Sequence, residues 1–285
     1  MNSRLFLISF LFFISNLIVQ AQTASSLFHL RDSVQVGEIV SVSGQMLDSV
    51  GHCGPAVENS HMILRILFDD RCAVDLYSKT GRGMELLKYK WYPSESEISE
   101  YAVGSDNYEE GNTLGFGGVA LWDGEKIVRL TASSGRIARV GNTSKGSYAE
   151  MISYGVVCGN DTVDVCFRID VFNKKRQAKV TVRELSGKKV RFVTGVNFHK
   201  GQTVVMGDGM AYVWGSHPCD STKSPVAVGA GIRYSAKKFE IADKTEDMVM
   251  LVSYPSNSIT TTLVGTSVKE AELNTLKRFD AFMRD

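Results

Sequence analysis

The chain has 285 residues, 44% of them hydrophobic, which is enough to bury a sizeable core. Its 32 Lys and Arg residues are balanced by 31 Asp and Glu residues, for a net charge of +1 at pH 7. Because no basic stripe accompanies this balance, the composition argues against nucleic acid as a partner. Five cysteines are too few for a disulfide-dense scaffold. One or two bridges and burial as small hydrophobic residues both stay open for them.

Residues 1–21 have the pattern of a secretory signal peptide. Arg4 supplies a positive charge, residues 5–19 form an apolar run, and a small residue, Ala21, offers a cleavage point. The run is too short for a membrane span, and no other stretch reaches the ~18 apolar residues that a membrane helix needs. We therefore expect an exported protein, periplasmic or secreted, with no transmembrane segment after cleavage. Residues 22–285 are then expected to form one domain.

Strand patterns dominate the rest of the chain. Residues 162–171 alternate strictly, with Val, Phe or Ile at every odd position and Asp, Cys or Arg at the even positions from 164 on. Such a period of two predicts a half-buried strand. Similar runs predict strands at 34–43, 62–69, 72–79, 178–184, 190–197, 210–214 and 248–253.

Only two segments have helical signals. Ser94 and Glu97 form a capping box that predicts a short helix after Pro93. Ser267 and Glu270 form a second one, which predicts a helix that runs from there to the C-terminus. Turn signals every ~8–12 residues with few helices predict a mostly β protein, a single large antiparallel β-sandwich with a short C-terminal helix.

Reactive groups gather between residues 52 and 79, on segments that are predicted to be strands. Elimination beside a carboxylate needs a base for the α-proton, a cation on the carboxylate and an acid for the leaving oxygen. His52 or His199 is the candidate base, because imidazole titrates near neutral pH. Tyr77 suits acid or base work if Lys79 or Arg65 lowers its pKa. Arg65 suits a bidentate grip on a uronate carboxylate, with Lys79 beside it.

Structural interpretations of the same residues stay open. His52 fits a loop histidine bonded to backbone, and Arg65 fits a cross-strand ion pair with an acid such as Asp75. Lys79 fits a solvated strand end. Of the other histidines, His61 is the next candidate for a functional role, whereas His29 and His217 fit surface or packing positions.

We expect no metal and no other cofactor, because no cysteine or histidine spacing indicates a metal site. A set made of His52, His199 and Glu58 is the alternative for a metal. Aromatic side chains at Tyr92, Trp122 and Trp214 are candidates for stacking on sugar rings, with core or rim packing as the alternative.

An ordered set of short motifs spans residues 52–215. They are His52-x-Gly54-Pro55-Ala56-x-Glu58, Arg65-x-x-Phe68-Asp69, Val74-Asp75-x-Tyr77-x-Lys79, Glu85-Leu86, Trp91-Tyr92-Pro93, Gly115-x-Gly117, Leu121-Trp122-Asp123-Gly124, Gly195, His199 and Trp214-Gly215. The set resembles the family catalogued as domain of unknown function 4861 (DUF4861). Cys53 stands between a His and a Gly that are adjacent in the family, and residues 260–264 replace an aromatic strand.

The resemblance implies an exported bacterial polysaccharide-utilisation protein with a sandwich like that of galactose mutarotases. It also implies an oligosaccharide ligand or substrate, and a lyase or dehydratase activity on uronic-acid-containing oligosaccharides. A non-catalytic glycan-binding or structural envelope protein is the alternative, favoured by the two departures from the family. A sugar epimerase or mutarotase is the third option.

Overall fold

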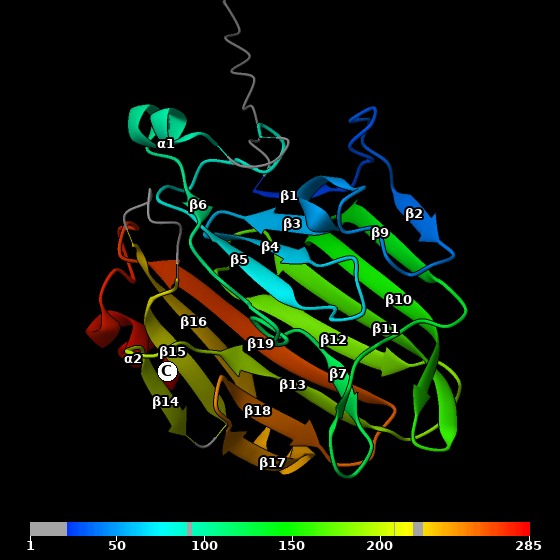
Figure 1. Ribbon diagram of the computed structural model, residues 1–285. Helices are drawn as coiled ribbons and strands as arrows, with labels where there is room; N and C mark the ends of the chain where they lie inside the picture. The colour runs from blue at the N-terminus through cyan, green and yellow to red at the C-terminus, as the bar shows by residue number, and fades with distance from the viewer. Residues whose placement is uncertain (1–21, 90–92, 208, 219–224) are drawn as a thin grey trace, which may run out of the picture.

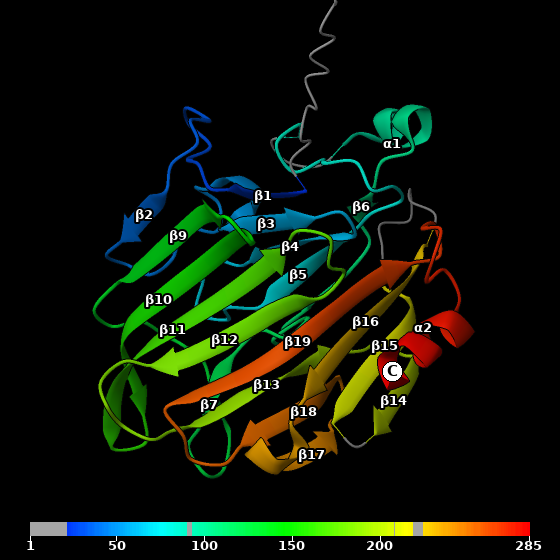
Figure 2. The same cartoon turned by 180° about the vertical axis from the view of Figure 1, so that it is seen from behind.

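The computed structural model describes residues 22–89, 93–207, 209–218 and 225–285. The predicted signal peptide lies outside these residues. The described part is mostly β, with antiparallel sheets in two layers and two short α-helices (Figures 1 and 2). The expected class, a mostly β antiparallel sandwich that ends in a short helix, is confirmed.

One layer is a nine-stranded sheet in the order β14-β15-β16-β19-β12-β11-β10-β9-β2. Its strands are β14 (Thr203–Gly207), β15 (Met210–Ser216), β16 (Ala227–Tyr234), β19 (Ser258–Ser267), β12 (Ala178–Glu184), β11 (Asp161–Phe172), β10 (Gly146–Cys158), β9 (Arg136–Thr143) and β2 (Glu38–Ser41). Figure 2 shows this sheet as the layer that faces the viewer, with β19 and β12 at its centre.

The other layer contains two five-stranded sheets, in the orders β1-β3-β4-β5-β6 and β17-β18-β13-β7-β8. The strands of the first are β1 (Thr23–Ser26), β3 (Ala56–Asn59), β4 (Met62–Ile66), β5 (Val74–Ser78) and β6 (Ser105–Asp106). Those of the second are β17 (Phe239–Lys244), β18 (Met248–Ser253), β13 (Arg191–Asn197), β7 (Ala120–Trp122) and β8 (Ile127–Val128). Two 3-10 turns complete the elements, at Gly51–Cys53 and Ala236–Lys238.

A single apolar cluster fills the space between the layers. It joins Leu64 of β4 and Val196 of β13 to Phe167 of β11 and Ile232 of β16, all of them fully buried. Odd-numbered residues of β11 face this core, as their alternation predicts. On β4 the even positions face the core, so Arg65 points to the outer face of its sheet.

Buried Arg136 of β9 holds loops together beside this core. The guanidinium is 1% exposed and donates to Ser153 Oγ and to the Gly44 carbonyl, both at 3.0 Å. It also donates to the carbonyls of Asp69 and Leu130. Its N–H groups are therefore satisfied by neutral oxygens, which lowers the cost of burying the charge.

The first helix, α1 (Glu95–Tyr101), begins where the capping box predicts. Ser94 Oγ accepts a hydrogen bond from Glu97 N at 3.3 Å, and Glu97 Oε2 accepts one from Ser94 N at 2.7 Å. None of the helix residues is buried, so the stability of the helix depends on its capping and on interactions within the helix rather than on packing.

Ser94→Ala is expected to weaken α1 by about 1 kcal/mol, because the first turn loses the oxygen that caps it. Amide hydrogen exchange over residues 95–101 measures this as faster local opening. Ser99→Ala, at an exposed position within the helix, is the matched control and is expected to leave protection unchanged or raised. Equal protection in both variants would contradict a capping role for Ser94.

The predicted start of the C-terminal helix is wrong. Residues up to Ser267 continue β19, and α2 (Leu276–Arg284) begins after Thr275, whose side chain accepts from Arg278 N at 3.3 Å. The earlier capping signal fails because the Glu270 carboxylate pairs with Arg176 at 2.9 Å instead of capping a helix.

Helix α2 packs on the outer face of the nine-stranded sheet through Phe279 and Met283, both buried. Gly231 of β16 permits this close approach, because a Cβ there would lie 2.6 Å from Met283 Sδ. No helix in the described ranges is long and apolar enough to cross a membrane. The four cysteines at positions 53, 72, 158 and 166 are free thiols, and Cys219 lies outside the described residues.

Candidate functional site

The two five-stranded sheets are joined by the segment that follows β6. Gly115 forms a parallel bridge with Val74 of β5, and Phe116 forms an antiparallel bridge with Val196 of β13. The amide of Phe116 donates to the Val74 carbonyl at 2.8 Å. Figure 1 shows this segment running from β6 to the space between β5 and β13. Residues 106–113 thereby carry polar side chains to the outer face, where the two sheets meet.

Two imidazoles lie against the backbone of this segment. His199 Nε2 lies 2.8 Å from the carbonyl oxygen of Glu109, and the Glu109 amide donates to His217 Nδ1 at 3.1 Å. The two rings meet edge to face, with their centroids 4.9 Å apart. Asn197 Nδ2 donates to the same carbonyl at 2.8 Å. We call Glu109, Glu110, Asn197, His199 and His217 the junction cluster.

The hydrogen bonds indicate where the ring protons lie. A carbonyl oxygen only accepts, so His199 presents a protonated Nε2 to Glu109, and in the neutral ring the lone pair then lies on Nδ1. Burial lowers the pKa of His217 to about 4, and His199 adds to this lowering, while the backbone contact with Glu109 opposes it. His217 is therefore neutral near pH 7, and its buried Nε2 has no hydrogen-bond partner among the described residues.

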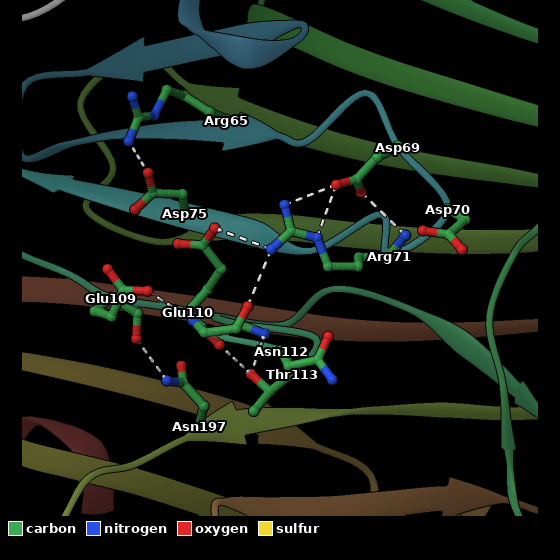
Figure 3. A network of polar contacts seen from close by, with 12 residues as sticks. Arg65, Asp69, Asp70, Arg71, Asp75, Glu109, Glu110, Asn112, Thr113 and Asn197 are labelled. Carbon is green, nitrogen blue, oxygen red and sulfur yellow. Dashed lines mark hydrogen bonds and ion pairs between the residues drawn. The ribbon is translucent and has the colours of Figure 1, made fainter. Parts of the chain in front are cut away.

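Burial favours the uncharged form of Glu110, as it does that of His217. It raises the pKa of Glu110, and the Glu109 carboxylate adds to the rise, whereas Arg71 at 3.6 Å opposes it. Figure 3 shows Arg71 between Asp69 and Glu110, with the chain of polar contacts continuing to Glu109 and Asn197. The junction cluster thus combines a carboxyl group that tends to keep its proton, Glu110, with a neutral imidazole, His217, and with His199 at the Glu109 carbonyl. Titratable groups with shifted pKa values that gather in one place are candidates for an acid–base site.

A cavity of about 260 Å³ adjoins the junction cluster. Thr113 and Met248 connect the two, because the Thr113 hydroxyl donates to the Glu110 carbonyl and Met248 is the strand partner of Asn197. The lining residues are Asn112, Thr113, Leu114, Ile127, Arg129, Asp247 and Met248. An apolar floor with a cation and polar groups at its rim is the kind of surface that holds a sugar ring.

His52, Arg65 and Tyr77 converge, but around a closed space. They line a cavity of about 10 Å³ with Glu85 and Leu86, among others, which is room for one water at most. Arg65 is 2% exposed and forms ion pairs with Asp75, its cross-strand partner, and with Asp106 at 3.2 Å. The carboxylates that Arg65 grips therefore belong to its own chain.

The expected activation of Tyr77 is wrong. Its hydroxyl donates to the Gly104 carbonyl at 2.7 Å and lies 3.1 Å from Glu85 Oε2. Burial, together with the Glu85 carboxylate, raises the pKa of Tyr77 rather than lowering it. Lys79 does not oppose this rise, because its ammonium forms an ion pair with Glu58.

Lys79 is not the solvated strand end that its position suggests. It is 2% exposed, and its Nζ donates to the Asn59 carbonyl at 3.1 Å as well as to Glu58. The Glu58 carboxylate also accepts from the amides of Glu85 and Leu86, at 2.7 and 2.8 Å. The ion pair thereby anchors the loop after β5 on the outer face of its sheet.

The aromatic candidates occupy different surroundings. Trp214 packs on Phe279 of α2, with ring centroids 5.7 Å apart, which agrees with a packing role rather than with stacking on a sugar ring. Trp122 is half-buried on the outer face of β7 and lines a hollow of about 570 Å³ with Lys189 and Arg191. Tyr92 lies outside the described residues. Trp122 therefore stays the aromatic residue best placed to meet a ligand.

Of the predicted acid–base residues, only His199 lies in the junction cluster. No hydrogen bond or ring contact joins it to His52 among the described residues. Sequence reasoning missed Glu109 and Glu110, and it assigned His217 to the surface or to packing. The sequence feature that could have indicated these two residues is a pair of adjacent glutamates before Gly111, in a segment with neither strand nor helix periodicity. Within the described ranges, no group of three or more His, Cys, Asp or Glu side chains is placed to hold a metal ion.

The buried histidines predict a loss of stability in acid. Burial, with the nearby Arg65, lowers the pKa of His52 from 6.5 to about 3. Below pH 6.5 the unfolded chain binds a proton that the folded chain excludes, so stability falls as pH falls. The expected loss from His52 is about 2 kcal/mol between pH 6.5 and pH 4.5.

Urea unfolding at a series of pH values tests this expectation. His52→Asn suits the test, because asparagine tolerates the positive φ of 55° at this position and does not titrate. The slope of stability against pH is expected to be shallower in this variant. Ile232→Val, which removes a methyl group from the core at β16, is the control that changes stability without changing the slope. Equal slopes in all three proteins would contradict the prediction.

The chain is similar to one sequence family and to several solved structures. The sequence model of a family described as domain of unknown function (DUF4861) matches residues 18–285. No curated protein matches the sequence. A putative aldose 1-epimerase from Klebsiella pneumoniae subsp. pneumoniae is similar in structure at a TM-score of 0.41 and 8% identity, covering 92% of this chain and 94% of that one.

A heparan sulfate lyase HepC mutant from Pedobacter heparinus is similar at a TM-score of 0.39 and 9% identity, covering 75% of this chain. The chain spans 34% of the lyase, about a third of its length. Similarity at this level concerns the arrangement of sheets and not the residues of a site.

Proposed function

Since the chain belongs to the DUF4861 family, which has no described function, we propose its activity from the junction cluster. The proposed function is that of an exported lyase or dehydratase that acts on uronic-acid-containing oligosaccharides from polysaccharide breakdown. The observation that carries the proposal is the meeting of His199 and His217 at the backbone of Glu109, next to Glu110, whose carboxyl pKa is raised by burial. Export, to the periplasm or beyond, rests on the signal-like pattern of residues 1–21.

The residue roles follow from the proton positions. His199 takes the α-proton of the uronate on Nδ1, whose lone pair is left by the Nε2 contact with Glu109. The electrons of that C–H bond form a carbon–carbon double bond as the β carbon–oxygen bond breaks. Glu110 gives its proton to the departing oxygen, so that water or an alcohol leaves. Arg129, partly exposed in the lining of the adjoining cavity, holds the uronate carboxylate as charge develops, whereas Arg71 is already paired with Asp69 at 2.7 Å.

Mass spectrometry of the reaction products tests the proposal. The protein is incubated with saturated and unsaturated uronate oligosaccharides, and loss of the mass of one water is expected for a dehydratase. A lyase instead divides the oligosaccharide and leaves an unsaturated end. Absence of either change with every uronate tested would overturn the proposal.

A second candidate is a glycan-binding protein without catalysis. The observation that favours it is the sealing of Arg65 and Lys79 by carboxylates of their own chain. Binding of intact oligosaccharide without turnover would support it. An epimerase or mutarotase, the third option, uses the same acid–base pair and changes sugar configuration at constant mass, which proton NMR detects.

A further inference from the structure

A second cavity, of about 840 Å³, lies on the outer face of the nine-stranded sheet and shares no lining residue with the junction cluster. Lys179 of β12 and Thr260 and Thr262 of β19 line it. These residues alternate with core residues such as Val180 and Leu263, so their side chains point away from the core. The turn after β11 and Phe282 of α2 form its sides. In Figure 2 the outer face of the nine-stranded sheet is turned toward the viewer.

Positive charge is concentrated in this groove. Its lining includes six Lys or Arg side chains and one carboxylate, Glu272, although the whole chain carries a net charge of only +1. The cations are Arg82, Lys174, Lys175, Arg176, Lys179 and Arg233. The three lysines are exposed, and none of them forms an ion pair with a described residue. We call this lining the cationic groove.

Part of the cationic groove is rigidly built. Arg176 is 7% exposed and is held by Glu270 at 2.9 Å and by Glu272 at 3.0 Å. Arg233 donates to the Phe282 carbonyl and lies over the Phe282 ring, 5.2 Å from its centroid. Its buried Nε has no hydrogen-bond partner among the described atoms. The guanidinium groups are therefore positioned before any ligand arrives, which reduces the entropy cost of binding.

We propose that the cationic groove binds an anionic saccharide chain, uronic or sulfated. Lys and Arg side chains bind carboxylate and sulfate groups, and Phe172 and Phe282 offer apolar surfaces for the faces of sugar rings. Thr260, Thr262 and Gln177 supply neutral partners for hydroxyl groups. The cavity volume lies within the range of about 300–1,000 Å³ that is typical of small-ligand sites.

Nucleic acid fits these observations less well. Proteins that bind nucleic acid usually carry a strongly basic net charge, and this chain is close to neutral. The inference goes beyond the proposed activity, because it adds a binding site that shares no residue with the junction cluster. A polymer held there would be retained by the protein without occupying the acid–base site.

Calorimetric titration of the full chain tests the groove at two NaCl concentrations. The probes are oligogalacturonate, oligoalginate, a heparin fragment, a neutral cello-oligosaccharide and a single-stranded oligonucleotide of matched charge. The test variant is Lys174→Glu/Lys179→Glu, and the charge-matched control is Lys237→Glu/Lys238→Glu, at two exposed lysines of the 236–238 turn with no ion pair among the described residues. Both lysines of the test variant are exposed, so the fold is expected to persist, which circular dichroism checks.

At least one acidic saccharide is expected to bind, and its affinity is expected to be lower at high salt. The Lys174→Glu/Lys179→Glu variant is expected to lower this affinity by about tenfold or more. The control and Glu110→Gln are expected to bind like the unaltered protein, which separates the groove from the proposed activity. Binding of no acidic saccharide, equal binding of the neutral one, or equal affinity in the Lys174→Glu/Lys179→Glu variant would overturn the proposal. Tighter binding of the oligonucleotide than of every acidic saccharide would overturn it as well.

Discussion

Replacing Lys79 with methionine is expected to lower the free energy of unfolding by about 3–5 kcal/mol. Methionine keeps most of the side-chain length but removes the ammonium, so the Glu58 carboxylate, 0% exposed, is left without its counter-ion. The amides of Glu85 and Leu86 still donate to it, and they compensate for only part of the loss. Urea denaturation followed by fluorescence measures the change.

The matched control is Lys188→Met. Lys188 pairs with Asp161 at 2.6 Å, but the two side chains are 44% and 60% exposed, so the expected change is below about 1 kcal/mol. A second arm, Lys79→Met with Glu58→Gln, is expected to recover part of the stability because no buried charge remains unpaired. The prediction is wrong if Lys79→Met and Lys188→Met lower the free energy of unfolding by the same amount.

Replacing Glu110 with glutamine is expected to lower the turnover of an active substrate by about 10²–10⁴-fold. Glutamine has the same shape and keeps polar contacts, but it has no proton to give to a leaving oxygen. Because burial raises the pKa of Glu110, the acid form persists to higher pH than for an ordinary carboxyl group. The rate is therefore expected to fall as pH rises through this pKa, and the variant is expected to lose that part of the profile.

Glu125→Gln is the control for this experiment, since Glu125 is an exposed glutamate in the turn after β7. Its turnover and pH profile are expected to match those of the unaltered protein. His199→Gln is expected to lower turnover to a similar extent through loss of the base. Full activity in both Glu110→Gln and His199→Gln would contradict the roles assigned to these two residues.

Strand alternation predicted much of the fold. The ranges 178–184 and 248–253 coincide with β12 and β18, because the first alternates to both ends and the second is a short apolar run of strand length. Strand β10 was missed, and the register shift between Ser153 and Val156 explains why. A bulge moves the following residues to the other face, so no single period of two describes the whole strand.

The candidate site was predictable only in part. His199 was identified from its residue type and the family resemblance, but its partners come from residues 108–113, which have no periodic pattern. The burial that raises the pKa of Glu110 arises from tertiary packing, which the local sequence does not encode. For the same reason Arg65 and Lys79 looked reactive in the sequence, whereas the fold supplies each with a carboxylate. Pairing between distant segments decides which charges remain available.

The bridges from Gly115 to Val74 and from Phe116 to Val196 have a consequence for the order of folding. They connect a strand near the beginning of the chain to one that is synthesised much later, so they close long loops and form slowly. Glu110 and His199 come to the same junction only after both sheets exist. A half-folded chain would keep much of its strand content without the junction cluster, so the proposed turnover would be a sensitive reporter of the final assembly step.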